Sequence, residues 1–380
     1  MFNLRKDFLL DPTVTFLNHG SFGATPKPVF KEYQRWQREL ELQPVEFLGR
    51  RYTDLMYASR EALANYLSTR AENLVYVQNA TIGLNIVARS LELKAGDEVL
   101  STNHEYGALD RTWRFLSKER GFVYINQKVD LTSQVDFVNS FLQGVTANTK
   151  VIFLSHITSP TATIFPIDQI IQFAKLRNII TVIDGAHAPG QIPLQLDLLG
   201  ADFYAGNLHK WLCAPKGAGF LYANPKSQHL LKPLIVSWGY ESVAPSNSKF
   251  VDEHEWQGTR DVAAFLTVPH AIAYQQNQNW DKVRSACHQL AVETWHRMNQ
   301  LLKETPLHAD PETWFAQMVV STLPAEVDVV VFKQRLYDQY RVEIPVLEWN
   351  EKKLIRLSVQ GYNSRLDTNR LMKALRKLII

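Results

Sequence analysis

Short apolar runs alternate with amphipathic stretches through the middle of the chain. Short, mainly apolar runs, which predict buried strands, occupy residues 74–77, 98–101, 151–155, 180–183, 203–204 and 219–222. Segments with apolar residues at helical spacing lie between several of these runs, at residues 81–93, 109–118 and 167–177. Apolar strands that are separated by helices indicate a mostly parallel sheet with both faces covered. The pattern therefore predicts an α/β fold in which ligands bind at the carboxyl ends of the strands.

The segments on either side of this region follow a different pattern. Two amphipathic helices are predicted ahead of it, at residues 28–42 and 53–67, and a long polar loop is predicted behind it, at residues 237–250. A helical stretch covers residues 261–303, and apolar runs and helices then alternate at residues 317–323, 325–340, 354–359 and 367–379. We therefore predict a large domain at residues 16–260 and a smaller α+β domain at residues 261–380 that includes the N-terminal residues 1–15.

Composition and charge exclude several classes of protein. The 380 residues carry a net charge of only +3, and the basic residues are scattered, which argues against nucleic-acid binding. No run of eighteen apolar residues occurs, and the first residues lack the apolar stretch of a signal peptide, so we expect a cytoplasmic protein without membrane contact. Cys213 and Cys287 are too few for a disulfide framework or a cysteine-rich zinc site. We find neither a glycine-rich nucleotide motif nor a zinc-binding His-Glu-x-x-His, so no metal is expected.

Two polar residues stand where neighbouring strands end. Asp184 closes the apolar run at residues 180–183, and Lys210 follows the run at residues 203–204. A lone Asp at such a place is more often a cap or a surface turn, but two such strand ends point to one crevice. Pyridoxal phosphate needs a lysine amine to form a Schiff base and an acidic partner that keeps its pyridine nitrogen protonated. We therefore interpret Lys210 as the Schiff-base lysine and Asp184 as the partner of the ring.

Two further segments suit the same cofactor. Gln78-Asn-Ala-Thr-Ile-Gly follows a strand and opens a helix, where free backbone N–H groups and the hydroxyl of Thr81 would bind a phosphate. His104 and Tyr106 follow another strand and could stack on a flat ring, although a loop with these residues more often packs against its surroundings.

Taken in order, these segments resemble the class V aminotransferase family, the cysteine-desulfurase-like branch of fold-type I pyridoxal phosphate enzymes. The resemblance rests on Asp184-Gly-Ala-His and Asn207-Leu-His-Lys, and it extends from about residue 16 to residue 361. Further motifs are similar to isopenicillin N epimerase-like members: Phe16-Leu-Asn-His-Gly-Ser-Phe-Gly, His104-Glu-Tyr-Gly-Ala, Ser155-His-Ile-Thr-Ser-Pro-Thr-Ala and Gln257-Gly-Thr-Arg-Asp. The resemblance implies a large domain with a mostly parallel seven-stranded sheet between helices, and a smaller C-terminal α+β domain.

The resemblance also implies roles for individual residues. His187 would lie near the phenolic oxygen of the ring, and His104 would stack on the ring, with Tyr106 in reserve. The phosphate would be bound by Ala80, Thr81, Asn207 and His209, and by Thr259 of a neighbouring subunit in a homodimer. Asn207 departs from the family, in which serine is common at that position, but an amide still donates.

The substrate side is implied in the same way. Arg356 matches the family arginine that binds the carboxylate of an amino-acid substrate in a bidentate pair, and Asn18 and His19 would line the same side. Residues 325–355 contain no cysteine, so the persulfide chemistry of the desulfurases is disfavoured.

Several reactions stay open. In each, Lys210 takes the Cα proton of an amino acid as a general base. Reprotonation from the other face gives epimerisation, for which His104, Tyr106 and Tyr240 are candidate acids. Expulsion of a β-substituent gives a lyase, such as a C–S lyase, and protonation at the cofactor gives an aminotransferase. We favour the epimerase because the nearest motifs are of that kind. A non-catalytic cofactor-binding protein would not need Lys210, Asp184 and Arg356 together.

Overall fold

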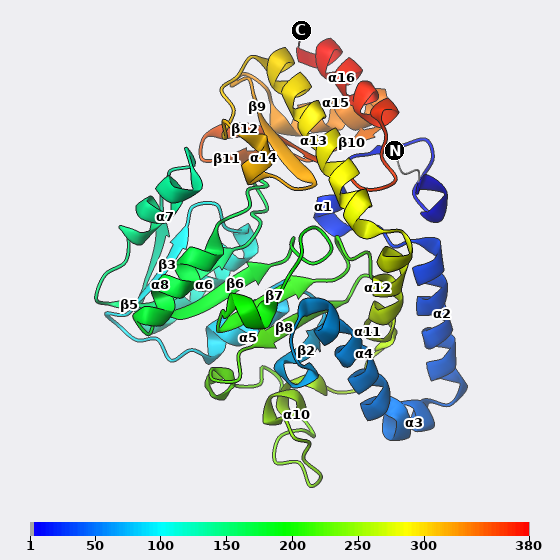
Figure 1. Cartoon of the computed structure of the whole chain (residues 1–380), viewed down its shortest axis with the longest axis vertical. Helices are drawn as coiled ribbons and strands as arrows, with labels where there is room; N and C mark the ends of the chain where they lie inside the picture. Colours follow the sequence, from blue (N-terminus) through cyan, green and yellow to red (C-terminus); the bar gives the residue numbers. More distant parts are fainter. Residues whose placement is uncertain (1–3, 380) are drawn as a thin grey trace.

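The computed structural model describes residues 4–379 of the chain. A seven-stranded sheet lies at its centre, with the strands in the order β2-β8-β7-β6-β5-β3-β4 (Figure 1). The strand β8 runs antiparallel to both of its neighbours, and every other adjacent pair is parallel. The predicted mostly parallel seven-stranded sheet is therefore confirmed. Its strands are β2 (Leu74–Val77), β3 (Glu98–Thr102), β4 (Val123–Gln127), β5 (Thr149–Ser155), β6 (Ile180–Gly185), β7 (Phe203–Asn207) and β8 (Gly219–Ala223).

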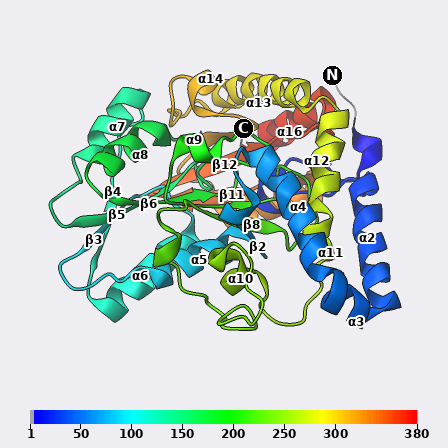
Figure 2. The same cartoon turned by 60° about the horizontal axis from the view of Figure 1, so that its bottom comes forward.

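Each face of this sheet carries a hydrophobic core, because successive side chains of a strand point to opposite faces. In β5, Val151 and Phe153 belong to one core, and Ile152 and Leu154 belong to the other. The first core contains α5 (Ala80–Ser90) and α6 (Gly107–Arg120). The second contains α4 (Tyr52–Leu67), α7 (Gln134–Leu142) and α8 (Ile167–Leu176). Figure 2 shows α5 and α6 below the sheet and α8 above it.

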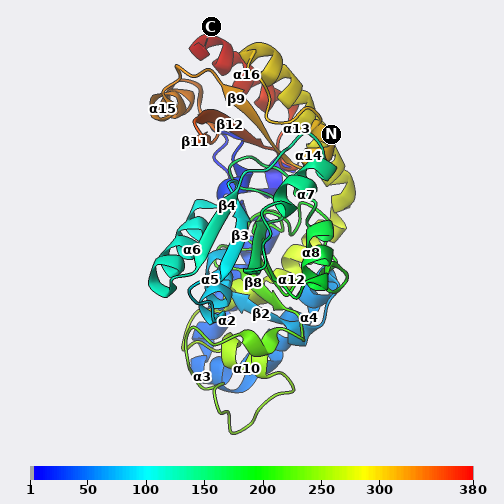
Figure 3. The same ribbon diagram turned by 90° about the vertical axis from the view of Figure 1, so that its left-hand side faces the viewer.

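A second, antiparallel sheet with the order β11-β12-β9 forms the smaller C-terminal domain. Its strands are β9 (Met318–Leu323), β11 (Val346–Trp349) and β12 (Lys352–Ser358), and its main helices are α13 (Trp280–Leu302), α15 (Val329–Tyr340) and α16 (Arg365–Ile379). Figure 3 shows this domain at one end of the molecule and the loop before α10 (Lys249–Glu255) at the other. The chain start joins this domain, because β1 (Thr15–Phe16) pairs with β10 (Val342–Glu343). The predicted boundary at residue 260 stays a prediction, and residues 1–3 and 380 of the predicted domains lie outside the described part.

The remaining helices show where the sequence pattern was too coarse. The stretch predicted as one helical region at residues 261–303 contains three helices, α11 (Ala263–Leu266), α12 (Val268–Asn277) and α13, and Pro269 lies at the start of α12. The polar loop ends earlier than predicted, because the side chain of Ser248 caps α10 by accepting from the Val251 N–H. The other helices are α1 (His19–Phe22), α2 (Lys27–Leu42), α3 (Pro44–Glu46), α9 (Leu196–Leu199) and α14 (Pro311–Trp314). Within residues 4–379, no helix combines the length and the apolar character needed to cross a membrane.

Candidate active site

A cavity of about 240 Å³ lies at the carboxyl ends of β5, β6 and β7, where the fold places ligands. Eight residues that the sequence predicted for the site line it: Ala80, Thr81, Tyr106, Asp184, His187, Asn207, His209 and Lys210. Ser21, Phe22, Ser155 and Ser159 also line it, and no signal in the sequence marked them apart from the motifs that contain them.

The amine of Lys210 sits 3.1 Å from Nε2 of His187. The indole N–H of Trp211 donates to Nδ1 of His187 at 3.3 Å, so Nδ1 must be the acceptor. Burial lowers the pKa of His187 well below its ordinary value, so the ring is neutral and its proton is on Nε2. That proton points at the lone pair of a neutral Lys210 amine. Burial, and next the charge of Arg356, lowers the pKa of Lys210 to about 7, against the opposing effect of Asp184.

Asp184 stands at the end of β6 and is buried beside the same cavity. Its Oδ1 accepts from the Ala186 N–H at 2.9 Å. Burial raises the pKa of Asp184, whereas that hydrogen bond and Lys210 act in the opposite direction. A cationic group in the cavity would therefore stabilise the buried carboxylate, which is what a protonated pyridine nitrogen provides.

The first turn of α5 presents a donor for an anion. The side chain of Asn79 caps the helix by accepting from the Ile82 N–H at 3.0 Å, and Oδ1 of Asn207 accepts from the Ala80 N–H at 2.8 Å. The Thr81 N–H has no acceptor among residues 4–379, so it remains free at a helix start that attracts anions. The Ala80 N–H, which was expected to bind phosphate, is instead satisfied within the protein. Asn207 retains its amide N–H groups for that role.

His209 lines the cavity, and its hydrogen bonding determines the tautomer of its ring. Its Nδ1 lies 3.2 Å from the carbonyl oxygen of Ala218, and a carbonyl only accepts, so Nδ1 carries the proton. Burial lowers the pKa of His209 to about 4. The neutral ring therefore carries its lone pair on Nε2, and it would have to take up a second proton in order to donate to a bound phosphate.

Arg356 lies on β12, behind the wall of the cavity that Ser21 and Ser159 form. Nη1 of Arg356 donates to the carbonyl oxygen of Ser159 and also lies 3.3 Å from the hydroxyl of Ser159. Nη2 of Arg356 donates to the hydroxyl of Ser21 at 3.2 Å. The guanidinium is buried, and burial lowers its pKa to about 10. No ion pair joins it to a carboxylate in the described part of the chain. A buried cation without a counter-ion is costly, so this position favours an incoming anion.

Five predicted residues do not line the cavity: Asn18, His19, His104, Thr259 and Arg356. The imidazole of His104 is buried against Trp349, with ring centroids 4.4 Å apart, and its Nδ1 bonds the hydroxyl of Thr161 at 2.9 Å. Tyr106, the reserve candidate, lines the cavity in its place. The amide of Asn18 donates to Glu343, and its oxygen accepts from Ser21. Asn18 therefore supports Ser21 of the wall from behind, whereas the contacts of His104 are with residues outside the wall.

His19 also acts from behind the cavity. Its Nε2 lies 3.0 Å from the carbonyl oxygen of Lys210, and its Nδ1 lies 3.0 Å from the hydroxyl of Tyr362. Burial lowers the pKa of His19 to about 3. This histidine therefore fixes the backbone that carries the lysine, although the sequence placed it on the substrate side.

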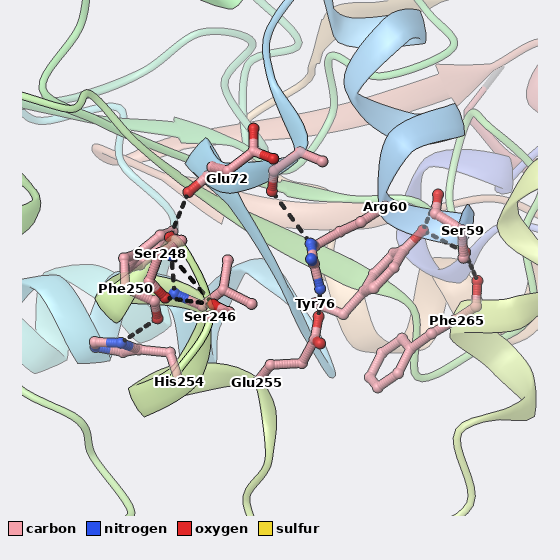
Figure 4. A network of polar contacts seen from close by, with 12 residues as sticks. Ser59, Arg60, Glu72, Tyr76, Ser246, Ser248, Phe250, His254, Glu255 and Phe265 are labelled. Atoms are coloured by element: carbon pink, nitrogen blue, oxygen red, sulfur yellow. Dashed lines mark hydrogen bonds and ion pairs between the residues drawn. The ribbon is translucent and has the colours of Figure 1, made fainter. Parts of the chain in front are cut away.

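Thr259 lies outside the cavity, in the bend that follows α10. A buried ion pair anchors this bend, since Nη1 of Arg60 donates to Glu255 and its Nε donates to the carbonyl oxygen of Ala71 (Figure 4). Arg260 continues the anchor by donating to the carbonyl oxygen of Glu255. The bend is thus held in place from its base, independently of the cavity.

The site combines four features: the neutral amine of Lys210, the buried carboxylate of Asp184, the helix start at Thr81 and the guanidinium of Arg356. Together these features suit pyridoxal phosphate and an amino acid. A family model described as Aminotransferase class-V matches residues 21–326. The isopenicillin N epimerase of Amycolatopsis lactamdurans is 34% identical over 99% of this chain and 98% of its own length. A probable chloroplastic L-cysteine desulfhydrase of Arabidopsis thaliana is 26% identical, over 97% of this chain and 84% of its own length. The fold matches a mutant of C-DES that has glycine covalently linked to its PLP cofactor, with a TM-score of 0.88, 21% identity and coverage of 98% and 99%.

Proposed function

The chain belongs to the class V aminotransferase family, and from this premise we propose that it is an amino-acid epimerase of the isopenicillin N epimerase type. Pyridoxal phosphate is its cofactor. The observation that carries the proposal is the pairing of two groups around one cavity. The amine of Lys210 faces the cavity beside a neutral histidine, and the guanidinium of Arg356 lies behind its wall without a carboxylate partner in the described chain.

Each of these residues has a definite task in the proposed reaction. Arg356 binds the carboxylate of the amino acid, and this orients the Cα–H bond toward Lys210. The neutral amine of Lys210 removes the Cα proton, for which a pKa of about 7 is well suited. Asp184 holds a proton at the pyridine nitrogen. Bound pyridoxal phosphate supplies the electron sink for the negative charge that develops at Cα.

Epimerisation also needs a proton donor on the opposite side of Cα. Of the three candidates, Tyr106 lines the cavity, whereas His104 is packed outside it and Tyr240 lies in the exposed loop before α10. We assign this role to Tyr106. The phosphate is bound by Thr81 and Asn207, and by Thr259 of a second subunit in a cytoplasmic homodimer.

A C–S lyase is the second candidate, and the desulfhydrase relative supports it. Persulfide formation remains disfavoured, because Cys213 and Cys287 are buried and neither lines the cavity. Burial also raises the pKa of both thiols to about 12, so neither is a ready nucleophile.

The test is to incubate the holoenzyme with a panel of L-amino acids in deuterium oxide. An epimerase incorporates deuterium at Cα and yields the inverted amino acid, whereas a lyase releases a keto acid, ammonia and the β-substituent. Lys210→Ala is expected to lose the visible cofactor band and the exchange, and Lys216→Ala, which changes a neighbouring lysine that does not line this cavity, keeps both. A wild-type protein that exchanges no Cα proton of any substrate would contradict the proposal.

A further inference from the structure

The turn at residues 158–163, which we call the Ser-Pro-Thr turn, connects β5 to the segment before α8 and carries Ser159 of the cavity wall. It closes on itself, because the Thr158 N–H donates to the carbonyl oxygen of Thr163 at 2.9 Å and the Thr163 N–H donates to the hydroxyl of Thr158 at 2.9 Å. Ala162 adopts a left-handed φ of 58°, which is uncommon for a residue other than glycine. A turn of this kind persists only where its surroundings determine it closely.

Those surroundings are a chain of buried hydroxyls that no step of the proposed reaction uses. The side chains of Thr158, Thr161 and Thr163 are fully buried. Oγ1 of Thr161 lies 2.7 Å from that of Thr158 and 2.9 Å from Nδ1 of His104. Oγ1 of Thr163 lies 3.2 Å from that of Thr161 and 2.8 Å from Nε2 of His308. The chain therefore runs from His104 to His308 through the turn.

The direction of this chain follows from His308. Its Nδ1 is buried without a partner among residues 4–379, and an unpaired lone pair there is a smaller loss than an unpaired N–H. The proton is then on Nε2 and is donated to Thr163, whose own hydroxyl donates on toward Thr161. Burial lowers the pKa of both His308 and His104 to about 3, so both rings stay neutral and the chain keeps this direction at neutral pH.

This series of hydrogen-bonded side chains, from His104 to His308, joins the two domains. His308 precedes α14 and stacks on Trp314, with ring centroids 5.1 Å apart, so it belongs to the C-terminal half of the chain. His104 follows β3 of the large sheet and packs against Trp349 of β11, whose indole N–H donates to the carbonyl oxygen of Asn103. Between these contacts, the carbonyl oxygen of Ser159 accepts from Arg356. The orientation of that guanidinium thus depends on a turn held from both sides.

We propose that Thr161, Thr163, His104 and His308 form a clamp that positions Ser159, and through it Arg356, for binding the carboxylate of the amino acid. These four are positioning residues, because they act on Arg356 only through Ser159 and are proposed to touch neither the cofactor nor the substrate. The inference rests on the proposed carboxylate-binding role of Arg356. It also gives a function to His104, which the sequence pattern assigned to the cofactor ring.

The experiment compares two probes that differ only by a carboxylate, L-alanine and ethylamine, titrated into the holoenzyme while the cofactor absorption is recorded. Thr163→Val removes the central hydroxyl but leaves the Nε2 proton of His308 without an acceptor. The double variant Thr163→Val/His308→Phe removes both partners, which preserves stability better. We expect both variants to raise the apparent Kd for L-alanine about tenfold, as the loss of one to two buried hydrogen bonds implies, and to leave that for ethylamine unchanged.

Two controls separate the possible failures. Thr294→Val makes the same substitution at a buried hydroxyl in α13, which donates to the carbonyl oxygen of Leu290 and takes no part in the hydrogen bonds of the turn, and it should change neither Kd. Arg356→Gln should weaken the binding of L-alanine and leave that of ethylamine unchanged. The clamp is wrong if Arg356→Gln weakens the binding of L-alanine and the double variant does not. It is also wrong if the double variant weakens the binding of both probes equally. If Arg356→Gln leaves L-alanine unaffected, the carboxylate role in the proposed function fails, and the clamp fails with it.

Discussion

The amine of Lys210 is expected to lose its proton near pH 7, because burial and the charge of Arg356 lower its pKa from 10.5 to about 7. Covalent attachment of pyridoxal phosphate requires the neutral amine, so attachment to the apoenzyme should accelerate as pH rises and level off above about pH 7. At pH 7 about half of the amine is then neutral, compared with roughly one part in 3000 for an ordinary lysine. The difference corresponds to about 5 kcal/mol.

Two variants of the same cavity shift this midpoint in opposite directions. Arg356→Gln removes a positive charge that disfavours protonation of Lys210, so the midpoint should rise. Asp184→Asn removes the negative charge that favours protonation, so the midpoint should fall. This opposition distinguishes a true effect of charge on Lys210 from a general loss of structure, which would move both variants alike.

The assay is rapid mixing of apoenzyme with pyridoxal phosphate between about pH 5.5 and 9.5, followed by visible absorption. Butylamine treated identically gives the pH dependence of the free cofactor, and Lys210→Ala should give no protein-bound band. A wild-type midpoint above about pH 9, or a shift in the same direction for Arg356→Gln and Asp184→Asn, would refute the reasoning about burial and charge.

Two further predictions concern the framework of the site. Glu255→Gln leaves the buried guanidinium of Arg60 without its counter-ion, so urea denaturation should show a free energy of unfolding lower by about 3–5 kcal/mol. The double variant Arg60→Met/Glu255→Leu should restore most of this loss, and a double variant as unstable as the single one would contradict the reasoning. Gly23→Ala should abolish cofactor binding, measured by visible absorption, because Gly23 has a φ of 69° and a Cβ there would lie 2.0 Å from the carbonyl oxygen of His209. Gly96→Ala is the matched control, since Gly96 also has a positive φ but its Cβ would meet open space, and equal cofactor loss in both variants would show that strain alone is responsible.

The sequence was sufficient for the elements that are apolar throughout. The central strands could be found because both faces of them are buried, which leaves a continuous apolar run. The strand β4 was missed because it lies at the edge of the sheet and is only partly buried, so Val123-Tyr-Ile-Asn-Gln has no such run. The short β10 and β11 were missed for the same reason.

The site was predictable where chemistry and strand ends coincide, as at Asp184 and Lys210. It was not predictable where two neighbouring residues face different ways. His104 and Tyr106 are two positions apart in one loop, yet only Tyr106 reaches the cavity, because the loop turns His104 onto Trp349 of the other domain. The contact of Arg356 with Ser159 joins positions 197 residues apart, and no local pattern marks such a pair.

The support of Lys210 by His19 has a consequence for the order in which the chain acquires its cofactor during translation. All strands of the central sheet have left the ribosome once residue 223 has emerged. The carbonyl of Lys210, however, is held by His19, and His19 is held by Tyr362, which is separated from it by 343 residues. A nascent chain that lacks its last residues therefore contains Lys210 but lacks the complete set of hydrogen bonds that hold its backbone, because contacts between distant parts of a chain form last. We therefore expect cofactor loading to follow completion of the chain, and chains truncated before Tyr362 to remain as apoprotein.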